Sequence, residues 1–483
     1  MGLLGILAGL GVLVWLSFRG WSVLVLAPLG ALVAAAFAVE PLLAHWTLTF
    51  MGSAAGFIAQ FFPLFLLGAI FGKLMDDSGA VAAIARFMTA KLGPQRAILA
   101  VVLAGAFVTY GGVSLFVAFF VLVPMGQGLF RVANIPNRLL PAAVALGTST
   151  FTMSALPGTP AIQNAIPMPF FGTTPFAAPG LGIIASAIML AFGLWWLARA
   201  EASARRAGEG YGAAVLGAER VAEDPETRGR ATTASGFDPA EIHEGSDSLD
   251  PPGPLVAATP LFVVVIVNLV MSLLVLPRLD LERIAGLRFD VASVGAVSGV
   301  WSVLVALALG IVTLIALNVR RLRGMRASID AGANASVLPV VSVASLVGFG
   351  AVVAAMPAFE SVRTWVLGID GGPLVSLALA TNILAALTGS ASGGLTIALD
   401  ALGGTYMELA AQLGIDPQLL HRVAVIGAGT LDSLPHNGAV VTLLALCGAT
   451  HKQGYFHIVM VGIVGAILGL VAVIVLGGQF GSF

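Results

Sequence analysis

Residues 255–276 read LVAATPLFVVVIVNLVMSLLVL and contain no charged side chain. An apolar run of about 20 residues is long enough to cross the hydrocarbon core of a bilayer as a helix. In lipid, every backbone N–H and C=O group needs a partner within the chain, so such a run must be helical. Comparable runs cover 3–18, 22–39 and 457–476. These stretches predict an all-α polytopic membrane protein.

The composition of the whole chain supports this prediction. Of its 483 residues, 58% are hydrophobic and 10% are charged, and the mean hydropathy is +1.00. A soluble domain carries roughly a quarter charged residues, so this chain lacks the polar surface needed to face water. The net charge of −1 predicts no nucleic-acid partner. We expect the lipid bilayer as the partner, a multi-pass location in the cell inner (plasma) membrane, and no cofactor or metal.

The apolar runs fall into two halves separated by a polar segment. Residues 200–253 hold 5 Arg and 11 Asp plus Glu, with Pro, Gly and Ser between them. This segment is too polar for the membrane and is predicted to be a loop joining a first repeat, 1–199, to a second, 254–483. The predicted spans lie near 3–18, 21–39, 53–72, 138–165, 180–199, 255–276, 291–318, 336–357, 372–400, 419–449 and 456–478, with a glycine-interrupted stretch at 96–126 and a weaker segment at 79–91.

Basic residues in short loops predict the orientation. Lys73 and Arg96 belong to one basic group between spans, Arg320 and Arg326 to a second, and Arg205 opens the polar loop. Placing all three regions in the cytoplasm is self-consistent. This predicts a cytoplasmic loop at 200–253.

The two halves share a sequence pattern. The start of 138–165 resembles the start of 419–449, and glycine pairs precede both at nearly the same distance. The matching positions are Leu139-Leu140 with Leu419-Leu420, Gly147 with Gly427, Thr150 with Thr430, Leu156-Pro157 with Leu434-Pro435 after a two-residue gap, and Gly111-Gly112 with Gly393-Gly394. Because each half is predicted to cross the membrane an odd number of times, the second repeat must be inverted relative to the first. Inverted repeats with paired broken helices are typical of secondary transporters.

Each half contains a span that polar and helix-breaking residues interrupt. A membrane helix does not normally place Pro, Gly, Asn and hydroxyls together at its centre. The broken helices are predicted at 138–165 and 419–449. Each of the two glycine-broken stretches, 96–126 and 372–400, is predicted to form a re-entrant hairpin whose small residues allow close backbone approach to a substrate. The candidate substrate-binding residues are Gly111, Gly112, Ser114, Ser149, Thr150, Ser154, Gly158, Thr159, Ser390, Ser392, Gly393, Gly394 and Asn437. A packing role for these Gly and Ser residues is the alternative.

Few ionisable groups lie in apolar surroundings, where charge is costly and suggests function. Asp432 and His436 stand one turn apart at the second break and are the candidate proton-coupling residues. A carboxyl group removed from water favours its neutral form, which allows reversible protonation. His436 has a capping role as its alternative. Asp400 and His421 are expected nearer the external surface, and no arginine is expected where it would clamp a second carboxylate of the substrate.

No enzyme motif is present: the sequence has no HExxH, no Walker lysine loop, no GxSxG and no paired Cys/His cluster of metal spacing. We therefore expect a transporter that is not an enzyme. A membrane-embedded enzyme or a channel subunit remains the alternative from another class.

Three stretches carry a family resemblance: STFTMSALPGTPAIQNAIPMPFFGT (149–173), TGSASGGLTIALDALG (388–403) and LDSLPHNGAVVTLLALCGATH (431–451). They resemble the gluconate permease family of organic acid:proton symporters, within the wider ion-transporter superfamily that includes citrate and dicarboxylate carriers. The resemblance implies a scaffold part, a mobile part that moves as an elevator, and a homodimer. It implies substrates such as gluconate and other sugar acids, citrate, or short hydroxy acids such as 3-hydroxybutyrate. The sequence lacks the Ser-Asn-Thr hairpin motif of sodium-coupled relatives, which favours protons.

Together, these features predict a secondary active transporter that imports a small organic anion with protons. The alternative on the same scaffold is a sodium/proton antiporter, in which Asp432 exchanges cations and no organic substrate exists.

Overall fold

The computed structural model describes residues 2–19, 21–212, 238–242, 244–245, 248, 250–280, 283–284, 286 and 291–483. Within these ranges the chain forms helices and no strand. In the described part of the chain, seven helices are long and apolar enough to cross a membrane, or eight if the pair Ala80–Leu92 and Pro94–Tyr110, bent by 103°, counts as one span. The seven are Leu42–Asp77, Leu115–Val132, Pro179–Arg206, Pro254–Arg278, Val297–Asn318, Met325–Ala355 and His451–Phe480. The prediction of an all-α polytopic membrane protein is confirmed.

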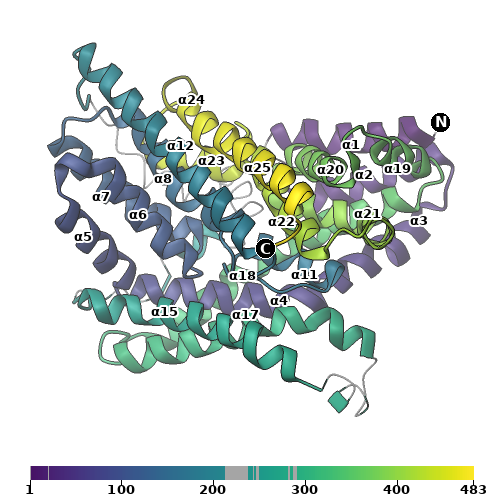
Figure 1. Cartoon of the computed structure of the whole chain (residues 1–483), viewed down its shortest axis with the longest axis horizontal. Coiled ribbons are helices and arrows are strands. Elements are labelled where there is room, and N and C mark those ends of the chain that lie inside the picture. The colour runs from purple at the N-terminus through teal and green to yellow at the C-terminus, as the bar shows by residue number, and fades with distance from the viewer. Residues whose placement is uncertain are drawn as a thin grey trace.

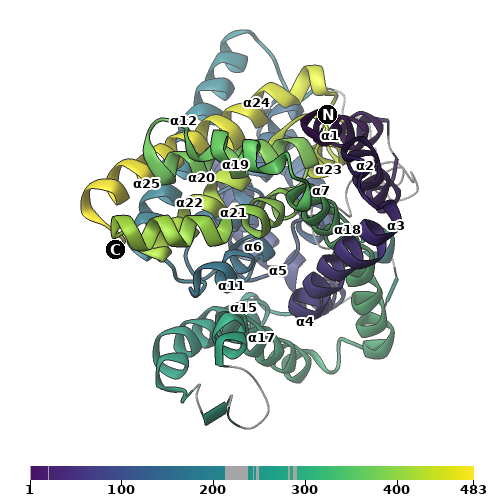
Figure 2. The ribbon, with the colours of Figure 1, turned by 90° about the vertical axis from the view of Figure 1, so that its right-hand side faces the viewer.

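Six helices pack side by side in one group, which we call the α4/α18 layer. Its helices are α1 (Gly2–Phe18), α2 (Val23–Ala38), α4 (Met51–Asp77), α15 (Pro254–Val270), α17 (Val291–Asn318) and α18 (Met325–Ala355). In space, α1 contacts α2, α2 contacts α18, α18 contacts α4, α4 contacts α17, and α17 contacts α15. The pair α15 and α17 lies at the edge of the molecule in Figures 1 and 2.

Small residues let the helices of this layer approach closely. A Cβ added to Gly332 of α18 would lie 2.7 Å from the Cα of Ile70 in α4. A Cβ on Gly9 of α1 would lie 2.4 Å from the carbonyl oxygen of Gly30 in α2. Lipid tails are as apolar as the side chains, so helix association in membranes depends on such close packing.

The second group, which we call the hairpin–break group, contains two helical hairpins and two broken helices. The first hairpin is α6 (Ala97–Tyr110) and α7 (Leu115–Val132), and the second is α20 (Gly372–Thr388) and α21 (Ala391–Leu413). The first broken helix consists of η3 (Asn137–Leu139), α8 (Leu140–Thr148), α9 (Phe151–Ser154), α10 (Ile162–Ala165) and α11 (Pro167–Phe171). The second consists of α22 (Pro417–Thr430), η7 (Leu431–Ser433) and α23 (Gly438–Leu446). The helices α12 (Pro179–Arg206) and α25 (Gly465–Phe480) pack against each other in this group.

Short elements complete the described chain. They are α3 (Leu42–Ala44), η1 (His45–Phe50), α5 (Ala80–Leu92), η2 (Pro94–Arg96), η4 (Pro239–Ile242), η5 (Met271–Val275), η6 (Leu276–Arg278), α19 (Phe359–Leu367), η8 (His451–Tyr455), α24 (Phe456–Ile458) and η9 (Val459–Val464). Figure 1 shows α1 and α2 beside α19 and α20 at one end of the molecule, with α5, α6 and α7 at the opposite end.

The order of elements is the same in both halves. A long helix (α4 or α18) is followed by a short amphipathic helix (α5 or α19), a hairpin, a broken helix and a long apolar helix that ends at Arg206 or Phe480. The breaks coincide with the predicted Gly/Pro/hydroxyl clusters. The first hairpin extends past the predicted 96–126, to Val132, and the second extends past 372–400, to Leu413.

The described residues between 238 and 248 lie against α4 and α18. The amide of Asp238 donates to the carbonyl oxygen of Ala335, and the amide of Ser248 donates to that of Asp77. Lys73 was predicted as a loop cation, but this is wrong: it is fully buried within α4. Its Nζ donates to Asp77 Oδ1 at 2.7 Å and to the carbonyl oxygen of Ile242 at 2.7 Å. The lysine is buried because residues near 242 cover this end of the helix.

A second ion pair fixes the start of the first broken helix. Arg138 donates from Nε and Nη2 to the two carboxylate oxygens of Glu209, both at 2.7 Å. These hydrogen bonds hold the pKa of Glu209 below its usual value, because they stabilise the charged carboxylate. The residues that follow α12 are thereby joined to the beginning of the broken helix.

Candidate functional site

Hydroxyl groups replace lost backbone hydrogen bonds at the first break. The helix α8 ends at Thr148, and Thr150 leaves the helical region with φ −117° and ψ −111°. The Thr150 hydroxyl donates to the carbonyl oxygen of Leu146 at 2.8 Å, and the Ser154 hydroxyl donates to that of Thr150 at 3.1 Å. The Leu146 carbonyl is thus satisfied by a side chain within the protein, as a non-helical segment in a membrane requires, while the Thr150 carbonyl also accepts from the Ser154 amide. Beyond it, Gly158 has φ +79°, a conformation that favours glycine.

At the second break the chain restarts with an asparagine cap. The helix α22 ends at Thr430, and Pro435 lies between η7 and α23. The Asn437 side-chain oxygen accepts a hydrogen bond from the Ala439 amide at 2.8 Å, which caps the N-terminus of α23. Proline cannot donate a backbone hydrogen bond, so it favours this interruption.

The second hairpin is held against the second break by a cluster of hydrogen bonds. Asp432 Oδ1 accepts from the backbone amide of Ala391 at 2.8 Å and from the side-chain amide of Asn437 at 2.7 Å. The same Asn437 amide donates to the carbonyl oxygen of Gly389 at 2.8 Å. His436 Nε2 lies 3.1 Å from the carbonyl oxygen of Ala386, to which it can donate. The two predicted proton-coupling residues therefore both contact the hairpin. We call these contacts the Asp432 cluster.

The first hairpin lies on the first break. Gly112 at its tip has φ +102°, and an added Cβ would meet Cγ of Pro160 at 2.9 Å. The Tyr110 hydroxyl donates to the carbonyl oxygen of Pro157 at 2.9 Å. Ser114 caps α7 by accepting from the Phe116 amide at 3.4 Å. Each half thus pairs its hairpin tip with its own broken helix.

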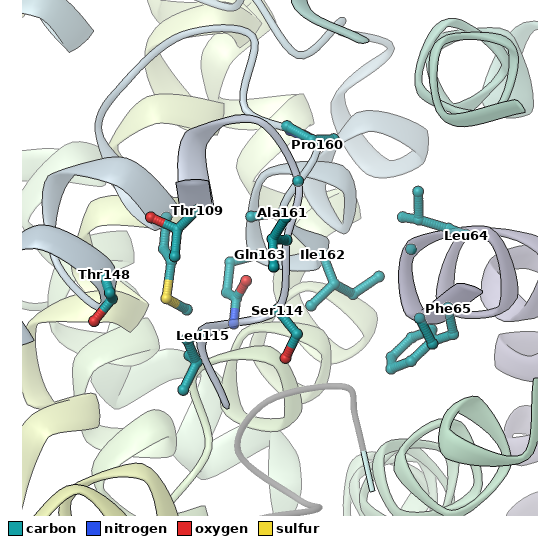
Figure 3. A pocket seen from close by; sticks show the side chains of 15 residues that line it. Leu64, Phe65, Thr109, Ser114, Leu115, Thr148, Pro160, Ala161, Ile162 and Gln163 are labelled. Atoms are coloured by element: carbon teal, nitrogen blue, oxygen red, sulfur yellow. The ribbon is translucent and has the colours of Figure 1, made fainter. Parts of the chain in front are cut away.

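A cavity of about 90 Å³ lies between the first hairpin tip, the first break and α4. Figure 3 shows Ser114, Ile162 and Gln163 on one side of this cavity and Leu64 and Phe65 of α4 on the other. The polar side chains that line it are neutral: Thr109, Ser114, Thr148 and Gln163. The cavity therefore lies between the α4/α18 layer and the hairpin–break group.

Residues of both halves line a smaller cavity of about 10 Å³. Ser149 from the first break and Asp432 from the second both line it. The breaks also approach each other directly, since a Cβ on Gly429 would lie 3.0 Å from Cβ of Ser154. The two interrupted helices meet inside the protein, and neither lies isolated against lipid.

The structure distributes the candidate substrate-binding residues over several environments. Gly112 and Ser114 line the larger cavity and Ser149 the smaller one. Gly111 packs under Leu261 of α15, and Gly393 packs against Leu346 of α18. The others take part in internal contacts around the breaks and the second hairpin tip: Thr150, Ser154, Gly158, Thr159, Ser390, Ser392, Gly394 and Asn437. Their roles in binding stay predictions.

The surface position predicted for His421 is wrong. Asp400 is exposed within α21, and its place near the external surface stays a prediction. The His421 side chain is fully buried. Its ring lies 2.6 Å from the Thr173 hydroxyl through Nδ1 and 3.2 Å from Asn164 Oδ1 through Nε2. The reason is that residues of the first half cover the start of α22.

Sequence reasoning missed Arg422, which is fully buried. Its Nε and Nη2 donate to the carbonyl oxygen of Ala177 at 3.2 and 2.7 Å, and its Nη1 donates to that of Ser154 at 3.2 Å. The available signal was a charged residue in the apolar run that opens the second broken helix. The cavity residues Thr109 and Thr148 were also missed, since isolated threonines on apolar helices carry no distinctive pattern.

Comparison with known proteins gives the family. A sequence profile described as "GntP family permease" matches residues 1–171. Over 488 residues, the chain is 38% identical to "Uncharacterized transporter YxjC" of Bacillus subtilis (strain 168), covering 99% of this chain and 100% of that protein. The chain belongs to the GntP family of permeases. It is a multi-pass inner-membrane transporter and not an enzyme, as predicted.

Two solved structures are similar to this GntP permease in fold. MtrF of Neisseria gonorrhoeae, described as illuminating a class of antimetabolite efflux pumps, is 15% identical with a TM-score of 0.52, covering 89% of this chain and 83% of that one. The Alcanivorax borkumensis YdaH transporter is 16% identical with a TM-score of 0.48, covering 90% and 88%. At these identities the likeness to MtrF concerns the fold alone. Among the residues that the structure describes, no group of three or more His, Cys, Asp or Glu side chains could hold a metal ion.

Proposed function

We propose that this permease is a secondary active transporter that imports a small organic anion together with protons. The proposed substrate is a gluconate-like sugar acid or a short hydroxycarboxylate. Membership of the GntP family supports transport of an organic acid. The observation that carries the proposal is the contact between two broken helices, one from each half, around Ser149 and Asp432. Irregular backbone at membrane depth is tolerated where it is buried in protein or lines a binding cavity.

The lining of the larger cavity favours a substrate with one carboxylate. Its polar groups are hydroxyls and one amide, which bind an anion through neutral hydrogen bonds. No lysine, arginine or histidine is among its lining residues, so nothing there would hold a second carboxylate as an ion pair. Ser114 and Thr148 are suited to hydrogen-bond the carboxylate and hydroxyls of such a substrate. Apart from Gly112 and Ser114, the candidate substrate-binding residues do not line the larger cavity in this structure. We propose that they contact the substrate once the cavity opens.

Asp432 is proposed to carry the coupling proton. It is the acidic side chain among the residues that line these two cavities. In the carboxylate form it is a strong acceptor for the Ala391 and Asn437 donors, because hydrogen bonds to a charged group are stronger than neutral ones. Protonation would weaken these bonds and so loosen the second hairpin. His436, which contacts the same hairpin, is proposed to assist this step.

An elevator movement fits the position of the larger cavity. The cavity lies where the hairpin–break group meets α4, so movement of that group along the α4/α18 layer would carry a bound substrate with it. The repeated order of elements supports two inverted repeats, and the α4/α18 layer is the proposed site of homodimer contact. The cavity of about 90 Å³ is smaller than the roughly 300–1,000 Å³ of typical ligand pockets, so substrate entry requires opening.

Transport by purified protein in proteoliposomes tests the proposal. Under an inward proton gradient we expect accumulation of labelled gluconate or 3-hydroxybutyrate by the wild type. Asp432→Asn should abolish uphill uptake while substrate exchange in the absence of a gradient persists, because asparagine keeps an oxygen acceptor but does not bind protons reversibly. Asp400→Asn, at an exposed carboxyl, is the matched control.

Two results would contradict the proposal. Wild-type accumulation by Asp432→Asn would remove the proton-coupling role. Sodium-driven collapse of the pH gradient, with no uptake of either acid, would instead identify the sodium/proton antiporter.

A further inference from the structure

Arg422 is a buried cation that the proposed transport steps do not use. The arginine is fully buried, and its guanidinium is bound by backbone carbonyls and by Asn164 Oδ1 at 3.4 Å. Among the residues that the structure describes, no carboxylate lies within 4.0 Å of it. A charge at this depth is costly to bury, and carbonyl oxygens solvate it without neutralising it. Its positive charge is therefore available to act on its surroundings.

The guanidinium binds two residues that are adjacent in sequence to residues lining the larger cavity. Its partner Ser154 follows Met153, which lines the cavity, and its partner Asn164 follows Gln163, which also lines the cavity. Arg422 thus holds both sides of the first break from a helix of the second half.

Close packing keeps the arginine in this place. Gly182 of α12 lies against both the first break and the guanidinium. A Cβ added there would lie 2.5 Å from the Ala155 carbonyl oxygen and 3.3 Å from Arg422 Nε, so a larger residue would not fit without a shift. The Asn164 amide donates to the carbonyl oxygens of Thr159 and Pro175, both at 3.0 Å, so the loop contacted by Arg422 is itself cross-linked. The charge is held in a fixed position relative to the cavity.

We propose that Arg422 is a positioning and specificity residue: its fixed positive charge favours anions in the cavity over neutral molecules of the same shape. This inference rests on the proposed function. In general, two unit charges about 10 Å apart at an effective dielectric constant of about 20 attract each other by an energy that corresponds to more than tenfold in affinity. Neutral hydroxyls then orient the substrate, while Arg422 supplies charge selectivity without touching it.

The test compares an acid with its amide. Labelled gluconate uptake into proteoliposomes is measured with unlabelled gluconate or gluconamide as competitor, for wild type, Arg422→Lys and Arg422→Gln. We expect wild type to prefer gluconate at least tenfold. Arg422→Lys should keep most of this preference because it keeps the charge. Arg422→Gln should lose it, with KM for gluconate raised about tenfold and a smaller change in maximal rate.

A purely structural role would give a different pattern. Arg422→Lys and Arg422→Gln would then lose maximal rate and thermal stability together, with the acid-to-amide preference unchanged, and the inference would be overturned. His421→Gln is the control, because it alters a neighbouring contact to Asn164 without removing the arginine charge and should keep the preference.

The wild-type measurement separates the remaining outcomes. Equal inhibition of the wild type by gluconate and gluconamide would overturn the inference even if Arg422→Gln fails to fold. If the wild type takes up gluconate and both Arg422→Lys and Arg422→Gln keep its preference for gluconate over gluconamide, this inference is overturned and the proposed function stands. No uptake of gluconate or of 3-hydroxybutyrate by the wild type would overturn both.

Discussion

Replacing Asn437 by alanine should release the tip of the second hairpin. The Asn437 amide connects Asp432 Oδ1 at 2.7 Å with the carbonyl oxygen of Gly389 at 2.8 Å, and the side-chain oxygen caps α23 through the Ala439 amide at 2.8 Å. One residue therefore joins the hairpin, the coupling carboxyl and the restarted helix. Alanine removes all of these hydrogen bonds and replaces none.

The size of the effect follows from these bonds. An N-cap contributes about 1 kcal/mol. Each of the two amide bonds contributes about 0.6 kcal/mol in a membrane protein, where the unfolded reference state also finds partners. The sum is about 2 kcal/mol, which corresponds to roughly a thirtyfold increase in the opening equilibrium of this region, since about 1.4 kcal/mol is a factor of ten.

Hydrogen exchange measures this opening directly. The Ala391 amide is bound to Asp432 and should exchange about sevenfold faster in Asn437→Ala, because the two amide bonds, about 1.2 kcal/mol together, hold the tip while the cap holds α23. Asn382→Ala is the matched control: its amide donates within its own helix, to Ala378, so exchange at the hairpin tip should change less than about threefold. Asn437→Asp keeps an N-cap but places a second carboxyl group against Asp432, so it should protect the first turn of α23 and still expose the tip. Equal tip exchange in wild type and Asn437→Ala would refute the reasoning.

Two further substitutions test packing and burial. Gly394→Ala places a Cβ 2.2 Å from the backbone nitrogen of Ala385 and should lower the free energy of unfolding by about 1–3 kcal/mol or more. Gly404→Ala, in the same helix, meets nothing within 4 Å and should be neutral or stabilising. Equal melting temperatures for the two variants would contradict the packing. Lys73→Met removes the lysine from an ion pair with no solvent exposure and should destabilise the protein by about 3–5 kcal/mol. The double variant Lys73→Met with Asp77→Leu should recover much of this stability. Thermal unfolding of the single and double variants measures both effects, and additive effects of the two substitutions would contradict the pairing.

The membrane fold was predictable from composition because lipid leaves few choices. Apolar runs such as 255–276 must be helices, and the breaks followed from Pro, Gly and hydroxyl clusters such as the one around Pro157. Two helical hairpins lie at the stretches that the glycine pairs indicated, and their re-entrant course stays a prediction. These features are local, so the sequence displays them directly.

Contacts between the halves were not predictable in the same way. The internal comparison placed His421 and Arg422 opposite Pro141 and Ala142, and this correspondence says nothing about which segments touch. Burial of Lys73 likewise depends on the carbonyl oxygen of Ile242, which lies far away in sequence. In a single sequence, the only trace of such a contact is an isolated charged residue within an apolar run. Arg422 is one such residue.

The separation of the two cavities constrains any coupled mechanism. The larger cavity belongs to the first hairpin and the first break, whereas the Asp432 cluster belongs to the second hairpin and the second break. Substrate in the one and a proton on the other can influence each other through the contact between the breaks. That contact consists of the small cavity shared by Ser149 and Asp432 and the close approach of Gly429 to Ser154. Because Ser154 is also bound by Arg422, the same short segment meets the substrate cavity, the fixed charge and the proposed proton site. A protonation that loosens the second hairpin would therefore act on the substrate through residues 149–154.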